Sequence, residues 1–283
     1  MRFDHSFSEG GLFMPETYAH YCMGRDVLDS LPDELYDRIS NYRSLFDIGL
    51  HGPDIFFYYI PVIPNHVNIT GYAMHKRNPR AFLKNARRVI RNEETAEDQN
   101  AELAYIFGFL CHYVLDRYFH AYIISAINKH KVNHSQLETA FDCRLIKKDG
   151  YDPKRYKITS HIHPSAYNST IISRFYAGIT PKEVRSAMYQ QIFLCNTLVS
   201  PSPYRKMMMN VAFLFTGTFK FMHNLLIMDS YSDKVEKCCD DMSALYELAV
   251  KDAVSSIGSF MRYMNGKSVL KGFGYSFKGL KDE

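Results

Sequence analysis

The sequence predicts an all-α fold, and three observations support this class. Nearly every periodic segment places its apolar residues at helical spacing. Helix start signals recur, for example Thr180 followed by proline and then by Glu183. The chain has 283 residues, 46% of them hydrophobic, with no repeat and no low-complexity stretch. We therefore expect one multi-helix domain over residues 1–283.

The first half of the chain predicts five helices and one long loop. Pro32 separates the first two helices, because proline cannot continue a helix. Asn78-Pro79 and Asn133 are cap signals for later helices. The predicted helices are 14–31, 32–46, 78–92, 98–129 and 133–141, and the stretch 49–71, rich in Pro, Gly and aromatic residues, is predicted as loop.

The second half predicts three more helices. The expected order is an irregular polar stretch over 144–168, a helix that begins at Thr180, helices over 204–228 and 232–265, and a loosely ordered tail over 267–283. Gly266 is a good C-cap for the last helix. The apolar stretch Met207–Met228 has the composition of a membrane span, but Lys220, His223 and Asn224 interrupt it, so we expect a central core helix.

Composition restricts the function classes. A net charge of +4 is too mild to imply a stable nucleic-acid partner, and nothing predicts an obligate protein partner. The six cysteines show no C-x-x-C motif, which favours reduced thiols over a disulfide frame or a zinc–thiolate site. Residues 1–11 are polar and charged rather than signal-like, so we expect a cytoplasmic protein.

The most informative pattern is a column of titratable residues on the predicted helix 98–129. His112, Asp116 and His120 follow one another at steps of four, which keeps them on one narrow face. Their neighbours are apolar nearly all round the helix, as in a buried helix. A buried column of this kind is costly without a partner, and metal ions are the simplest partner.

A second pair follows on the next helix. His134 and Glu138 are again four residues apart, and one ligand from the neighbouring helix, such as His120, would leave a coordination position open for water. Asp116 is suited to bridge two ions with its two oxygens, and such metal pairs hydrolyse phosphate esters. The competing interpretation, hydrogen-bonded core histidines, explains one such pair more easily than two.

Three further residues are ambiguous by themselves. Asp54, in the tight turn after Gly52-Pro53, is either a metal ligand or general base, or a turn residue bonded to its own backbone. His75 and His20 are either ligands or packing residues. The basic face of helix 76–91 would suit an anionic surface, including peripheral contact with a membrane, but a solvated helix face is favoured.

Together these residues resemble the zinc-dependent phospholipase C family, part of the all-helical phospholipase C and P1-nuclease superfamily. The matching stretches are PETYAHYCMG, GLHGPDIFFYY, GYAMHKRNP, GFLCHYVLDRYFHAY and NHSQLETAFD, which cover about the first half of the chain. The resemblance implies three metal positions. Their ligands would be Asp54, His75, His112 and Asp116 for the first, His120, His134 and Glu138 for the second, and His20 with the bridging Asp116 for the third.

The chain departs from the resemblance at the third position. In secreted members that ion is also held by the amino group and carbonyl of an N-terminal tryptophan, and this chain has no tryptophan. Either His5 or His51 substitutes, or the enzyme runs with two ions. We therefore expect two or three ions per chain, zinc by resemblance, although other divalent metals suit the same ligands.

The functional hypothesis is a metal-dependent phosphodiester hydrolase that cleaves a phospholipid or a related phosphodiester, with Asp54 as the residue that orients or deprotonates the attacking water. A nuclease or small-molecule phosphodiesterase on the same site is the first alternative, with Tyr58, Tyr59 and Tyr72 as candidates to stack bases. The second is a helical metal protein without catalysis, such as a di-iron carboxylate protein. Those proteins use paired Glu-x-x-His motifs, and Glu138 is the only glutamate among the predicted ligands.

Overall fold

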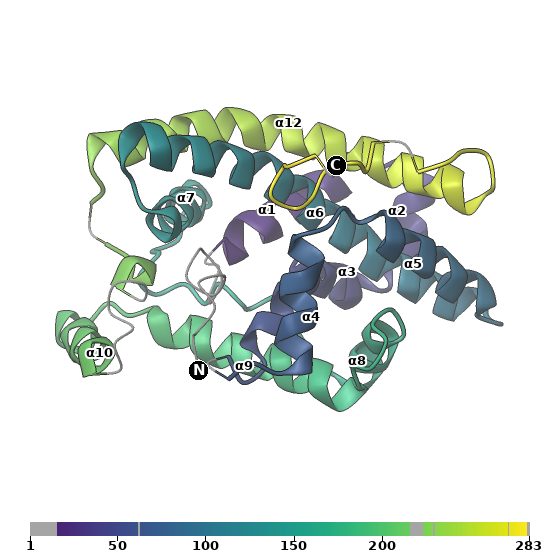
Figure 1. Cartoon of the computed structure of the whole chain (residues 1–283), viewed down its shortest axis with the longest axis horizontal. Helices are drawn as coiled ribbons and strands as arrows, with labels where there is room; N and C mark the ends of the chain where they lie inside the picture. The colour runs from purple at the N-terminus through teal and green to yellow at the C-terminus, as the bar shows by residue number, and fades with distance from the viewer. Residues whose placement is uncertain (1–15, 62, 216–222, 229, 271, 282–283) are drawn as a thin grey trace.

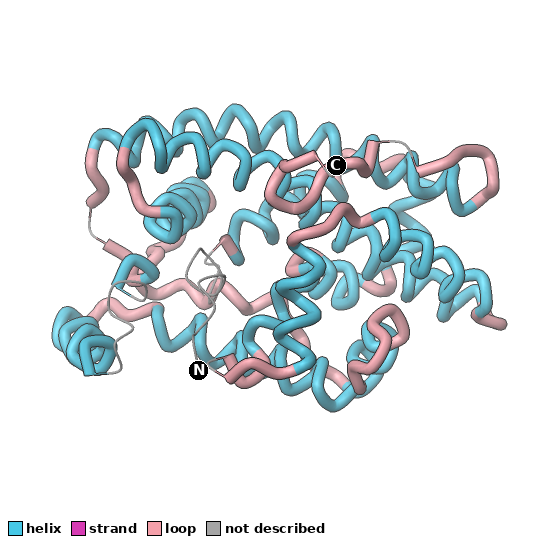
Figure 2. Tube along the Cα trace, viewed as in Figure 1, coloured by secondary structure: helices cyan, strands magenta, loops and turns pink. Residues whose placement is uncertain are grey.

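The all-α prediction is confirmed. The computed structural model describes residues 16–61, 63–215, 223–228, 230–270 and 272–281, and Figure 2 shows their regular elements to be helices. Within these ranges the extended pairing is limited to an isolated bridge between Tyr275 and Lys281. The elements are α1 (Thr17–Leu28), α2 (Asp33–Ser40), α3 (Arg43–Gly49), the 3-10 helix η2 (Gly52–Tyr58), α4 (His66–His75), α5 (Arg80–Asn92), α6 (Ala96–His130), α7 (His134–Lys148), α8 (Ala166–Ser173), α9 (Pro181–Leu198), α10 (Pro203–Phe215), the short 3-10 helix η3 (His223–Leu225) and α12 (Asp233–Met264).

The long helix α6 is the centre of the fold. It packs against α1, α2, α3, α5, α7, α8, α12 and η2, and α12 runs beside it along one side of the molecule (Figure 1). The Thr95 side chain caps α6 by accepting from the amide of Asp98, and the acidic first turn and basic last turn suit the helix dipole. Because α6 is covered from several directions, its middle is buried all round, as the sequence predicts.

A glycine pair brings the N-terminal helices onto α6. Gly49 ends α3 and faces Gly108 on α6, and a Cβ built on Gly108 would lie 2.1 Å from the carbonyl oxygen of Phe46. A Cβ built on Gly49 would lie 2.3 Å from the carbonyl oxygen of Tyr105. Only glycine permits this backbone approach, which carries η2, directly after α3, against the middle of α6.

Two polar anchors fix the helices on either side of α6. The Asp142 carboxylate on α7 accepts hydrogen bonds from the backbone amides of Tyr18 (3.1 Å) and Ala19 (2.8 Å), and so caps α1 from another helix. On the other side, Arg117 of α6 forms an ion pair with Asp252 of α12. Both anchors hold helices that border the column on α6.

The prediction of a loop over 49–71 is wrong. Residues 52–58 form η2, and α4 begins at His66. The helix start was missed because Asn68, rather than Glu or Gln, completes the capping box with Asn65. Gly52 has φ +47, a left-handed conformation that lets the chain turn into η2 and bring Asp54 inward.

The structure also corrects the region around 141–168. Helix α7 continues to Lys148 instead of ending at Phe141, because its inner face stays buried through Ile146. The stretch predicted as irregular over 144–168 therefore begins inside a helix, and its end overlaps α8. The long irregular connection is 149–165.

The prediction of a core helix over Met207–Met228 is wrong for the described residues. Helix α10 ends at Phe215 and has no buried residue. Residues 223–225 form η3, residues 226–228 have no regular secondary structure, and residues 216–222 lie outside the described ranges. The apolar composition of α10 therefore does not serve the core of this chain.

The tail is packed, contrary to the loosely ordered tail that we expected. Phe273 and Phe277 are both 1% exposed and belong to the main hydrophobic core. The Tyr113 hydroxyl of α6 donates to the carbonyl oxygen of Tyr275 (2.9 Å). The segment closes over α6 between α12 and α4 (Figure 1).

We predict that Gly108→Ala destabilises the protein by about 1–3 kcal/mol, because its Cβ would force α3 away from α6. Gly258→Ala on α12 is the matched control, since the nearest atom to its Cβ is Arg262 Nη1 at 3.6 Å. The control should gain up to about 1 kcal/mol of helix propensity. Urea unfolding followed by circular dichroism measures both, and equal stabilities would contradict the glycine contact.

Candidate metal centre

Helix α6 presents the predicted column into the interior. His112 and Asp116 are 0% exposed and His120 is 3% exposed. Seven of the eight predicted ligands are buried, and His134 is partly exposed. The structure gathers all eight into three neighbouring groups. Within each group the candidate ligand atoms lie within 4.8 Å of one another.

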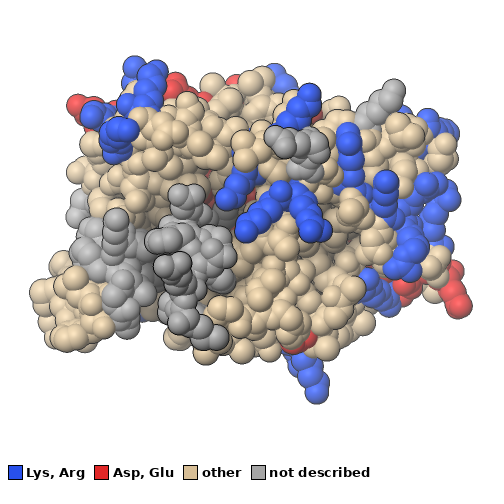
Figure 3. All heavy atoms as spheres, in the orientation of Figure 1, with Lys and Arg blue, Asp and Glu red and all other residues tan. Residues whose placement is uncertain are grey.

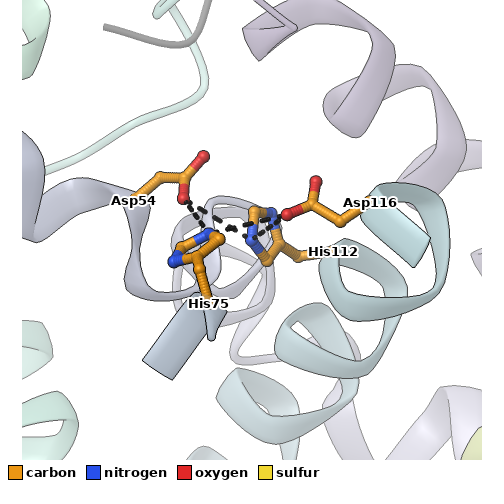
Figure 4. A group of neighbouring side chains, drawn as sticks. All are labelled: Asp54, His75, His112 and Asp116. Carbon is orange, nitrogen blue, oxygen red and sulfur yellow. Dashed lines mark ion pairs between the residues drawn. The ribbon is translucent and has the colours of Figure 1, made fainter. Parts of the chain in front are cut away.

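The first group joins three elements around one point (Figure 4). Asp54 comes from η2, His75 ends α4, and His112 and Asp116 come from α6. Asp54 Oδ1 lies 2.7 Å from His75 Nε2 and 3.8 Å from His112 Nε2. Asp116 Oδ2 completes the group, 3.4 Å from His112 Nε2 and 3.5 Å from His75 Nε2. Two imidazole nitrogens and two carboxylate oxygens thus converge.

The second group lies one turn further along α6. Glu138 Oε1 is 2.6 Å from His134 Nε2 and 3.8 Å from His120 Nε2. The His134 side chain is 27% exposed, whereas Glu138 is 1% exposed. This group therefore has one side open towards solvent.

Backbone carbonyls orient two of the imidazoles. The carbonyl oxygen of Gly71 accepts from His75 Nδ1 at 2.9 Å, and that of Phe277 accepts from His120 Nδ1 at 3.3 Å. A carbonyl only accepts, so each Nδ1 carries a proton and each Nε2 is the ring nitrogen that faces the site. The packed tail thus belongs to the site, a role that sequence reasoning did not give it.

The third group consists of Glu16, His20 and Asp116. His20 Nε2 lies 3.3 Å from Asp116 Oδ1 and 3.9 Å from Glu16 Oε2. Glu16 is 2% exposed and was missed by sequence reasoning. The same step of four that identified the α6 column also separates Glu16 from His20, so the spacing in PETYAH carried the signal.

Of the two predicted substitutes for the third position, only His51 lies among the described residues. His51 is instead paired with His161, with their Nε2 atoms 2.7 Å apart. His5 lies outside the described residues. Glu16 is the residue that accompanies His20 and Asp116.

The charges in the centre are strongly coupled. Burial alone would raise the pKa of Asp116, but His112 and His120 hold it well below its usual range. Burial and the nearby carboxylates of Glu138 and Asp116 raise the pKa of Glu16 well above its usual range. A cation bound between these carboxylates would offset their repulsion and favour the ionised form of Glu16.

The two histidines of the first group differ. Burial lowers the pKa of His112 to about 4, so its imidazole is neutral and ready to bind a cation. Burial would also lower the pKa of His75, but the facing Asp54 carboxylate raises it to about 10. Binding a metal at this group must therefore displace a proton from His75.

The donor set fits zinc. Both oxygens of Asp116, both nitrogens of His112 and both oxygens of Glu16 are buried without a hydrogen-bond partner. Buried polar atoms are rarely left unpartnered, and a shared cation would satisfy several of them at once. Imidazole and carboxylate without thiolate is the ligand set of a catalytic rather than a structural zinc site. The six cysteines are free and contribute to none of the three groups.

An all-helical chain with three adjoining buried His/carboxylate groups is a helical metalloprotein with a multinuclear centre. The comparison with known families specifies this class. The family model for zinc-dependent phospholipase C matches residues 19–189, more than half of the chain, so the chain belongs to the zinc-dependent phospholipase C family. This family implies a hydrolase that depends on zinc. No curated protein and no solved structure matches the chain significantly.

Among the described residues, none of the helices combines the length and the apolar character required to cross a membrane. The matched region contains His20, seven other predicted ligands and every element from α2 to α8. It excludes Glu16, α10, α12 and the tail. The third group and the carbonyl that orients His120 therefore draw on residues outside the family match.

We predict that Gly52→Ala lowers zinc affinity by about tenfold to a hundredfold. A Cβ at residue 52 would lie 2.2 Å from His112 Cδ2 and displace the ring. Gly150→Ala is the matched control, because Gly150 also has a positive φ (+83) but nothing within 4 Å of its Cβ. Zinc titration against a competing chelator measures both variants. Equal affinities would show that the contact with His112 does not matter.

Proposed function

We propose that this protein hydrolyses the phosphodiester bond of a phospholipid on the glycerol side, releasing diacylglycerol and the phosphorylated headgroup. The observation that carries the proposal is the position of Asp116 between two ligand groups. Its Oδ2 faces His112 and His75, and its Oδ1 faces His20 at 3.3 Å. A carboxylate shared in this way suits a bridge between two ions, the arrangement used for in-line displacement at phosphorus.

Zinc would be held by Asp54, His75, His112 and Asp116, by His120, His134 and Glu138, and by Glu16, His20 and Asp116. When bound there, the ions supply neutralisation of the phosphate oxygens, a water of lowered pKa and stabilisation of the leaving alkoxide. The Gly71 and Phe277 carbonyls keep His75 and His120 in the tautomer that this binding requires.

Asp54 is the residue best suited to orient the attacking water and accept its proton. Its Oδ1 faces His75 and His112, while its second oxygen points away from both imidazoles in Figure 4. One oxygen can then bind a metal ion, and the other can accept the proton of the water. Burial of Asp54 at 7% exposure keeps bulk water from competing for that position.

The packing of the candidate base-stacking tyrosines favours a phospholipid over a nucleic acid. Tyr58 is 2% exposed, and its hydroxyl accepts from Cys195 Sγ at 3.6 Å. Tyr72 stacks on Phe57 with ring centroids 4.4 Å apart. A single-strand nuclease needs exposed aromatic faces for bases, and two of the three predicted tyrosines are committed to other contacts.

A di-iron carboxylate protein is also disfavoured. Such centres draw on paired Glu-x-x-His motifs and four glutamates. Here each group contains at most one glutamate, Glu16 in the third and Glu138 in the second. The histidine-rich sets suit hydrolytic zinc better.

We predict that the zinc-loaded protein cleaves phosphatidylcholine and not single-stranded DNA, and that Asp54→Asn lowers kcat by about 10²–10⁴. Product analysis by mass spectrometry identifies diacylglycerol and phosphocholine. Asp240→Asn is the control, because Asp240 is 72% exposed on α12, where it pairs with Arg144. Full activity in Asp54→Asn with zinc still bound would exclude Asp54 as the residue that orients the water. Cleavage of DNA but not of phosphatidylcholine would show that the substrate is a nucleic acid instead of a phospholipid.

We predict three zinc ions per chain, of which Glu16→Ala loses one. The lost ion is the one shared by Glu16, His20 and Asp116. The control is Glu34→Ala, an exposed glutamate in the first turn of α2, which should keep all three. Plasma mass spectrometry on protein purified without chelator gives the count. If the wild type and both variants each contained two ions, the prediction would be wrong and the third group would not bind metal.

A further inference from the structure

Helix α10 turns an apolar stripe towards solvent. Its exposed apolar residues follow one another at steps of three and four, which places them on one face. They are Tyr204, Met207, Met208, Val211, Leu214 and Phe215, exposed by between 45% and 89%. An amphipathic helix normally turns this face to the core, so the orientation here requires an external partner or an apolar medium.

A shallow groove lies on the preceding helix, α9. Lys182, Arg185, Tyr189 and Phe193 line a shallow depression on α9, and both aromatic rings are exposed. The Gln190 side chain between these rings accepts from the backbone amide of Ile60 at 3.1 Å. Because Ile60 follows η2, the groove is directly connected to the 3-10 helix that carries Asp54.

The charge of this surface has one sign. From Val184 to Met228 the sequence contains no Asp or Glu, while Arg185, Arg205 and Lys206 lie on α9 and α10. In Figure 3 the α10 end of the molecule is an uncharged surface. Glu183, at the start of α9, is paired with His66 and with the Thr180 cap. The other charged side chains of α9 and α10 are cations, and apolar and aromatic side chains flanked by cations are typical of segments that lie in the interface of an anionic membrane.

We propose that α10 and the α9 groove dock onto the surface of an anionic phospholipid bilayer, with the α10 stripe inserted at the boundary between headgroups and acyl chains. This inference rests on the proposed function only in taking phospholipid as substrate. A symmetric pairing with a second copy is disfavoured, because the same patch would meet itself and bring the exposed Arg205 towards its own counterpart. The family match does not account for α10, which lies beyond residue 189.

The basic helix α5 is a weaker candidate for this surface, although Lys and Arg gather over it in Figure 3. Two of its arginines are engaged with the end of α12. Arg87 lies over the ring of Tyr263 at 4.6 Å, and Arg91 donates to the carbonyl oxygen of Met264 at 2.7 Å. Its inner face packs on α6, so no apolar stripe remains for insertion.

The test is flotation of the zinc-loaded protein with vesicles of phosphatidylcholine alone or of equimolar phosphatidylcholine and phosphatidylserine. We expect binding to the mixed vesicles, and a loss of about tenfold or more in the Met207→Ser/Leu214→Ser double variant. Leu248→Ser is the control, because Leu248 is 52% exposed on α12, close to the 55% of Met207. Arg205→Gln should reduce the preference for phosphatidylserine.

A second readout separates docking from catalysis. The double variant should cleave monomeric short-chain phosphatidylcholine at the wild-type rate and vesicles more slowly. Three outcomes would overturn the docking proposal. The wild type does not bind vesicles, the double variant binds them as well as the wild type does, or the wild type is a dimer and the double variant is a monomer. Vesicle binding without any phosphodiester cleavage would keep docking and reject the proposed function.

Discussion

The burial of the Asp116 carboxylate is the constraint on which the rest of the structure depends. It sits at 0% exposure on α6, with neither oxygen in a hydrogen bond. An ionised group in that position is tolerated only where positive charge surrounds it. Its neighbours His112 and His120 are four residues away on either side, and His20 and His75 arrive from other helices. The packing of α1 and η2 on α6, and of α4 on η2, serves this convergence.

A glycine contact and a side-chain cap let these helices approach one another closely. The contact between Gly49 and Gly108 removes the side chains that would hold α3 and η2 away from α6. Asp142 caps α1 from α7, so α1 and α7 keep a fixed relation at the ends that carry Glu16 and Glu138. Asp142 is 4% exposed at this junction, and its burial raises its pKa to about 7.

The features that were predictable from the sequence depend on local spacing, and those that were not depend on distant contacts. Helix α6 and its column follow from periodicity, because steps of four are a property of one helix. The packed tail did not follow, because the partners of Phe277 lie on α4 and α6, far away in the chain. The sequence predicts a core position for the apolar residues of α10, and this is wrong because composition does not distinguish buried apolar residues from exposed ones.

A chain of contacts links the outward face of α10 to the open side of the metal centre. Lys206 of α10 donates to the carbonyl oxygen of Ile227 at 2.6 Å. That segment continues from η3, which packs on α7, the helix that begins with His134. His134 is the most exposed of the candidate ligands, so a phosphodiester would approach from this side. A bilayer held by α10 would therefore be linked through η3 and α7 to the open side of the metal centre.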